Sequence, residues 1–274
     1  MVIANILFGF TSLLALVLAL FVFIANPRKG VNRSLAALLL SIFLWLVTNL
    51  ATNLSADPRL ALFFARMTLI GPLFFTFFFM IFTEIFQSTK KYTNKKMLIE
   101  MVPILALVPL MPTSLNIKSI GPYGAETVVG PLYTPATILA VIYMIRAVVK
   151  LYLKYSKAPT AAARMQVKYI FIGILGAFIP SLITNAILPV FVESDSFLYG
   201  PNSVIILAVF MTIAIVKHRL LDIRLIVARS ITYVLLFAAV LVIYGIVILG
   251  IGEFVLPETK VTVIERIFYI AFAL

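Results

Sequence analysis

Apolar runs of about 16 to 27 residues recur from one end of this sequence to the other, separated by short polar stretches. About 20 consecutive apolar residues are what one helix needs to cross a lipid bilayer. Charged residues make up only 12% of the chain, about half the share typical of soluble domains. The sequence therefore predicts an all-α, polytopic membrane helix bundle, in which a seven-helix core is followed by an eighth span and a truncated ninth. The expected spans are 2–25, 34–54, 60–85, 97–112, 132–153, 169–191, 200–216, 230–256 and a ninth from about 261.

The basic residues indicate which ends of these spans face the cytoplasm. If the N-terminus is outside, 17 of the 22 lysines and arginines fall in or beside the first, third, fifth and seventh connections. Since cytoplasmic connections carry an excess of lysine and arginine, this distribution predicts an N-terminus outside the cell. The net charge of +12 then points to lipid headgroups as partners and not to nucleic acid. The other five basic residues are Arg59, Arg66, Lys118, Lys260 and Arg266.

The residue types present exclude most catalytic chemistry. The chain has no cysteine and one histidine, His218, so thiolate metal sites, cysteine nucleophiles and multi-histidine metal centres are excluded. We therefore expect no catalytic residue, no metal and no cofactor in this chain. Glu84 and Glu100 lie near the four lysines of the third connection, and local ion pairing is what we expect of them.

Polar residues inside membrane spans are candidate functional sites, because a polar group in hydrocarbon is costly without a partner. Here they gather in the outer parts of several spans, which favours an outward-facing polar cavity among the second, third, sixth and seventh. Arg66 would recognise an anionic group there. The alternative is interhelical hydrogen bonding, worth about 0.6 to 2 kcal/mol per contact, with Arg66 reaching the outer headgroups. The candidate ligand-binding residues are Trp45, Asn49, Asn53, Arg66, Asn185, Tyr199 and Asn202.

A second hypothesis concerns Pro180, which follows Gly173 and Gly176 in the sixth span. Proline removes a helical hydrogen bond and can kink its helix, so Pro180 is a candidate hinge between the two ends of this span. The alternative is that the small residues only allow neighbouring helices to pack closely.

Sequence motifs at the end of the seventh span and in the earlier loops and helices resemble those of a known family. The stretch LYGPNSVIILAVFMTIAIV followed by KHRLLDIRLIVARSITYVLL resembles the N-terminal seven-helix membrane region of bacterial sensor histidine kinases. In that family a short basic loop follows the first helix, as in NPRKGVNRS, and the third helix carries a Gly-Pro step, as in MTLIGPLFFTFF. A long outer loop precedes the fifth helix, as in GPYGAETVVGPLY. The seventh ends in an arginine-leucine-x-aspartate signature, matched by Arg219, Leu220 and Asp222.

The resemblance implies the input module of a two-component signalling protein in the bacterial plasma (inner) membrane. It implies a sensor domain at 1–224, then a segment 225–274 that leads toward a cytoplasmic region missing from this sequence, so we expect no catalysis in this chain. Expected partners are the bilayer, a second copy in a homodimer, a cytoplasmic kinase domain or response-regulator pathway, and an unknown small ligand. A small-solute transporter or another non-signalling membrane protein is the alternative, although the sequence shows no convincing internal repeat. Candidate signal-coupling residues are Pro180, Lys217, His218, Arg219, Asp222 and Arg224.

Overall fold

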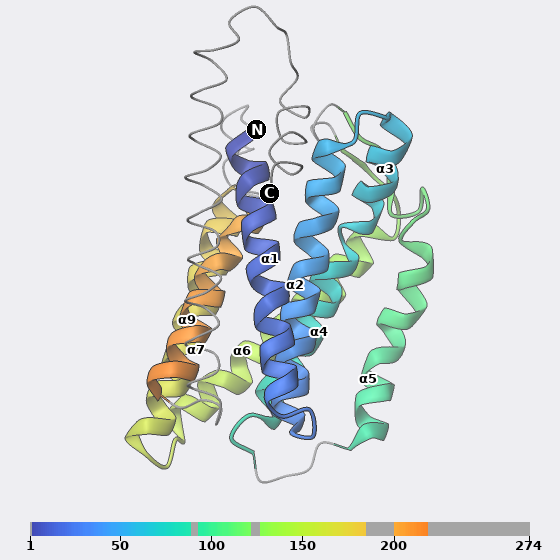
Figure 1. Ribbon diagram of the computed structural model, residues 1–274. Helices are drawn as coiled ribbons and strands as arrows, with labels where there is room; N and C mark the ends of the chain where they lie inside the picture. The colour runs from blue at the N-terminus through green and yellow to red at the C-terminus, as the bar shows by residue number, and fades with distance from the viewer. Residues whose placement is uncertain (1, 89–92, 122–126, 185–199, 219–274) are drawn as a thin grey trace, which may run out of the picture. The chain divides into compact units, whose positions relative to one another are not determined.

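The computed structural model is mostly helical and describes residues 2–88, 93–121, 127–184 and 200–218 (Figure 1). The connections after α1 and α6 are short, so α1 runs antiparallel to α2 and α6 runs antiparallel to α7. Five segments of the described chain are long and apolar enough to cross a membrane, as the sequence predicts for a membrane protein. The helices are α1 (Val2–Ala25), α2 (Gly30–Leu54), α3 (Pro58–Met67), α4 (Ile70–Ile85), α5 (Asn94–Leu107), α6 (Tyr133–Ser156), α7 (Ala161–Leu182) and α9 (Val204–His218), with 3₁₀ turns η1 (Val108–Leu110) and η5 (Pro201–Ser203).

The structure agrees with some expected spans and differs from others. The expected third span is one of the five candidate spans, Pro58–Ile85, although it consists of two helices, α3 and α4. The expected fourth is the 14-residue α5 followed by η1, and the expected seventh contains the 15-residue α9; neither is among the five. Helix α7 begins at Ala161, eight residues before the expected start, because the Thr160 side chain caps it by accepting from the Ala163 N–H. The expected eighth and ninth spans and the boundary at 224 lie outside the described residues.

The break between α3 and α4 follows from Pro72. Its missing N–H cannot bond the carbonyl of Thr68, so the first helix ends there and Pro72 occupies the first turn of α4, where no N–H is needed. The Thr68 hydroxyl donates to the Ala65 carbonyl at 2.7 Å. Asp57 caps the N-terminus of α3, because its side chain accepts a hydrogen bond from the Arg59 N–H at 2.8 Å.

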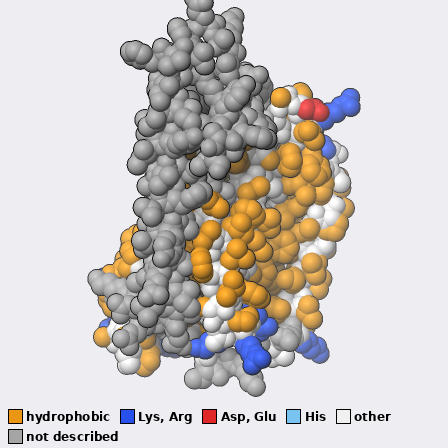
Figure 2. Space-filling model, viewed as in Figure 1, with side chains coloured by type: hydrophobic (Ala, Val, Ile, Leu, Met, Phe, Trp, Pro, Cys, Tyr) orange, Lys and Arg blue, Asp and Glu red, His pale blue; other side chains and the backbone are white. Residues whose placement is uncertain are grey.

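Among the helices that the structure describes, α4 has the largest share of buried residues. It packs against α2 and α6, and its phenylalanines Phe77, Phe79 and Phe82 are fully buried. Helix α7 in turn packs against α6 and α9. On the visible face, hydrophobic side chains cover the long sides of the helices, while lysines and arginines gather mainly at one end (Figure 2). This distribution suits helices that contact lipid along their length.

The long loop after η1 contains two short strands, a departure from the all-α expectation. Strands β1 (Ile117–Ser119) and β2 (Val128–Val129) pair antiparallel. At their base the Gly130 N–H donates to the Asn116 carbonyl at 2.6 Å, and a Cβ on Gly130 would lie 2.2 Å from the Leu115 carbonyl oxygen. Only glycine fits there. We call the end of the bundle that carries these strands the hairpin end, and the opposite end, with the connections after α1, α4 and α6, the lysine end.

Candidate functional site

The asparagines of the expected polar cavity are used for local and interhelical bonds. The Asn49 side chain donates to the Trp45 carbonyl of its own helix at 2.7 Å. The Asn53 side chain donates to Asn5 Oδ1 at 3.1 Å and so joins α2 to α1. Asn53 thus makes the interhelical hydrogen bond that the alternative interpretation expects. Asn202 is buried in η5.

Arg66 holds the hairpin against α3. Its Nε donates to the Ile117 carbonyl at 2.8 Å, and its two terminal nitrogens lie 3.4 Å from the carbonyls of Pro112 and Lys118. In return, the Asn116 side chain donates to the Arg66 carbonyl at 2.7 Å. These partners are neutral, so they position the guanidinium without cancelling its charge. Recognition of an anion by Arg66 stays a prediction.

A small cavity lies where several of the expected cavity helices meet. Its volume is about 60 Å³, and it takes residues from α2, α4, α6, α7, η5 and α9. Trp45 is one wall, and Ser181 and Ser203 are its only hydroxyl-bearing residues. This cavity is therefore mostly apolar, and Trp45 is the one candidate ligand-binding residue that lines it; the predicted polar cavity stays a prediction. The other lining residues are Phe75, Met144, Ile174, Ala177, Phe178, Pro201 and Val204.

Glycines set the close approach of the helices around this cavity. A Cβ on Gly71 would lie 2.4 Å from Trp45 Cβ and 2.7 Å from Trp45 Cα, so α2 and α4 touch backbone to backbone. Cβ atoms on Gly173 and Gly176 would lie 2.9 Å and 2.7 Å from side-chain atoms of α9. The close-packing alternative proposed for the glycines of the sixth span therefore describes α7 and α9.

Pro180 lies in α7 one turn beyond Gly176, beside the cavity. Because proline has no N–H, the Gly176 carbonyl loses its helical partner. The next carbonyl, of Ala177, accepts a hydrogen bond from the Ser203 hydroxyl at 2.6 Å. This bond ties η5 to α7 at the point where α7 is weakest, which suits the hinge hypothesis. That hypothesis stays a prediction.

The remaining residues predicted from the sequence fall beyond what the structure describes. Asn185 and Tyr199 lie outside the described residues, as do the coupling candidates Arg219, Asp222 and Arg224. Lys217 and His218 end α9, and only their backbone is described.

An ionic cluster joins α4, α5 and α6. Arg146 lies 2.7 Å from Glu100 and 3.6 Å from Glu84, and Lys150 lies 3.0 Å from Glu84. The Tyr143 hydroxyl donates to the Glu100 carbonyl at 2.5 Å. Only 14% and 15% of the Glu84 and Glu100 side chains are exposed, so both carboxylates depend on these cations. Ion pairing was expected for both glutamates, with the lysines of the third connection as partners. The ion pairs described here are with Arg146 and Lys150 of α6.

A basic stripe on α6 is the feature that sequence reasoning missed. Arg146, Lys150, Lys154 and Lys157 are spaced four, four and three residues apart, which places them on one face of a helix. That spacing was the available signal. Lys154 donates to the carbonyls of Glu84 and Phe86 at the end of α4. The stripe thus runs from the ionic cluster to the lysine end.

Comparison with known proteins gives one match. A family described as the N-terminal 7TM region of histidine kinase matches residues 7–224. No curated protein and no solved structure matches the chain. Among the described residues, no group of three or more histidines or carboxylates could hold a metal.

Proposed function

Because this chain belongs to the family of N-terminal 7TM regions of histidine kinases, we propose that it receives an extracellular or membrane-borne signal and passes it to a cytoplasmic kinase region by helix rearrangement. As a family member it is a membrane-embedded sensory module. The proposal extends to a homodimer in the bacterial plasma membrane, with a response-regulator pathway downstream.

The observation that carries this proposal is the apolar cavity beside Pro180. A signal shifts a two-state equilibrium only if it has different affinities for the two arrangements. A small apolar molecule or a lipid chain that fills the cavity would separate walls contributed by α2, α4, α6, α7, η5 and α9. Helices α4, α6 and α7 also reach the lysine end, so a change in their packing at the cavity would change their arrangement at the lysine end as well.

A cavity-filling substitution tests this function directly. We expect Ala177→Val, which adds two carbons at the cavity wall, to change the autophosphorylation rate at least threefold when residues 1–274 are fused to the catalytic region of a histidine kinase. The measurement is phosphate incorporation in membrane vesicles. The control is Ala106→Val. Ala106 is exposed on α5, so this variant makes the same chemical change outside the cavity. Equal rates for both variants and the wild type would contradict the proposal.

The proposed orientation places the N-terminus and the hairpin end outside. Its support is the excess of lysine and arginine in the connections of the lysine end. The chain has no cysteine, so single introduced cysteines report their own side. In intact cells we expect Ser119→Cys to react with a membrane-impermeant maleimide, and Lys95→Cys to react only after permeabilisation. The reverse labelling pattern would show that the N-terminus and the hairpin end face the cytoplasm.

A further inference from the structure

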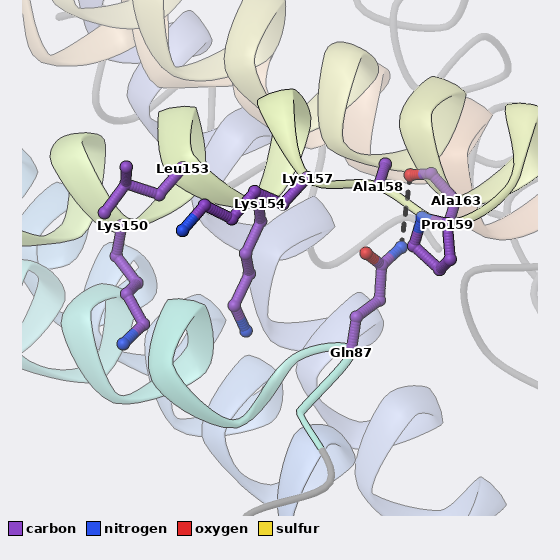
Figure 3. A pocket seen from close by; sticks show the side chains of 8 residues that line it. All are labelled: Gln87, Lys150, Leu153, Lys154, Lys157, Ala158, Pro159 and Ala163. Carbon is purple, nitrogen blue, oxygen red and sulfur yellow. Dashed lines mark hydrogen bonds between the residues drawn. The ribbon is translucent and has the colours of Figure 1, made fainter.

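A second, larger hollow opens at the lysine end, away from the cavity described above. Its volume is about 390 Å³, within the range of small-molecule sites. It is formed where α6 ends, α7 begins and the chain leaves α4. Figure 3 shows Lys150, Lys154 and Lys157 reaching from α6 into this region, with Gln87 on the other side.

The walls of this pocket are fixed by hydrogen bonds between the elements. Gln87 donates to the Ala163 carbonyl at 3.1 Å and to Gln166 Oε1 at 2.7 Å, which ties the end of α4 to the first turns of α7. Gln87 holds a left-handed backbone with φ of 51°, a conformation that a non-glycine residue rarely adopts. Lys154 ties the same end of α4 to α6. The pocket is therefore a built feature of the fold.

The side chains around the pocket carry a net positive charge. The four cations of the basic stripe face two carboxylates, Glu84 and Glu100, which leaves two positive charges. Lys154 is bonded to neutral carbonyls, so its charge is not cancelled. Within the described part of the chain, the ammonium of Lys157 has no hydrogen-bond or ion-pair partner. A phosphate group supplies the acceptors that such ammonium groups lack.

An apolar stripe beside the basic one favours a lipid over a free anion. Ile145, Val149 and Leu153 recur every four residues on α6, one position before Arg146, Lys150 and Lys154. Their exposed fractions are 58%, 52% and 44%. Leu153 also lines the pocket. An acyl chain can follow these side chains along the span while its headgroup lies among the lysines. Basic pockets between membrane helices are known to bind anionic headgroups.

We propose that this pocket binds the phosphate-bearing headgroup of an anionic phospholipid, with an acyl chain along Ile145, Val149 and Leu153. The site does not require the sensory function or either orientation of the bundle. Bound lipid would link α4, α6 and α7 at the lysine end.

The test is a titration of the purified full chain in neutral detergent. Short-chain phosphatidylglycerol, short-chain phosphatidylcholine and inorganic phosphate are added separately, and the midpoint of thermal unfolding is followed. We expect phosphatidylglycerol to raise the midpoint at concentrations where the other two do not. Lys157→Glu should weaken its apparent affinity about 25-fold and Lys157→Gln about fivefold, from roughly a fivefold effect per charge. Lys95→Glu, which reverses an exposed charge at the same end, should leave the affinity within twofold.

Three results would overturn the proposal. Equal shifts with phosphatidylcholine would remove the role of the anionic headgroup. An equal response to inorganic phosphate would show a free-anion site in place of a lipid site. Equal losses in Lys157→Glu and in Lys95→Glu would show general surface attraction and no pocket. Within the described part of the chain only the backbone N–H of Lys157, which donates to the Leu153 carbonyl, supports the fold, so its glutamine variant remains informative if the charge reversal fails to fold.

Discussion

Replacing Arg146 with methionine is expected to lower the free energy of unfolding by about 1 to 3 kcal/mol, because Glu84 and Glu100 are mostly buried while Arg146 itself is 38% exposed and partly screened by solvent. Arg146 contacts both Glu84 and Glu100. Its removal leaves Glu100 without this cation about two turns into α5. The measurement is unfolding in mixed micelles of increasing denaturing-detergent content.

Two further variants separate the cluster from a general effect of charge. Arg164→Met removes an arginine at the same end whose guanidinium lies 6.0 Å from the Tyr155 ring, a contact worth about 1 kcal/mol or less at an exposed site. The double variant Arg146→Met with Glu100→Gln should recover part of the loss, because it also removes the charge of the mostly buried carboxylate that has lost this arginine. A loss no larger than that of Arg164→Met would show that the cluster does not stabilise the bundle.

Replacing Gly71 with alanine is expected to have the second large effect. The added Cβ would meet the backbone of Trp45, which has no flexible end to give way, so α2 and α4 must move apart. Overpacking of this kind costs about 1 to 3 kcal/mol. Trp45 is the only tryptophan, so its fluorescence reports the displacement directly. We expect a shifted emission maximum together with a lower midpoint of unfolding.

Gly9→Ala is the matched control for Gly71→Ala. A Cβ on Gly9 has nothing within 4 Å, and alanine is the better helix former by about 1 kcal/mol. This variant should keep the emission maximum and raise or preserve the midpoint. If the two glycine variants behave alike, helix propensity and not close approach governs the Gly71 position.

The sequence predicted most spans because length and apolar character alone decide them. It missed the break before α4, since a Gly-Pro step is compatible with a kinked continuous helix as well as with two helices. It also missed the strands near Gly130, because a pair only two or three residues long leaves no alternating pattern.

The predicted ligand-binding role of the candidate residues stays a prediction. Asn49 and Thr52 share one face of the expected second span, which is the face that the sequence assigns to a polar cavity. In the structure each bonds the carbonyl four residues earlier, Trp45 and Thr48, so the polar atoms are satisfied within α2. Side-chain direction of this kind cannot be read from spacing. The partners of Glu84 and Glu100 were missed because the sequence does not show that α6 is the neighbour of α4 and α5.

The structure connects the cavity with the lysine end through three shared helices. Phe75 and Glu84 both lie on α4, and Met144 and Lys150 both lie on α6. Helix α7 carries Ala177 at the cavity and Ala163 at the lysine-end pocket. A helix moves largely as a rigid element, so repacking at one site displaces side chains at the other.

The central claim is that filling the cavity changes the arrangement of helices at the lysine end. Spin labels at Arg28→Cys and Ala162→Cys, both exposed, measure the distance between the turn after α1 and the start of α7. With Ala177→Val we predict a shift of about 2 Å or a second population, and with Ala106→Val an unchanged distribution. Superimposable distributions for folded wild type and folded Ala177→Val would contradict the account.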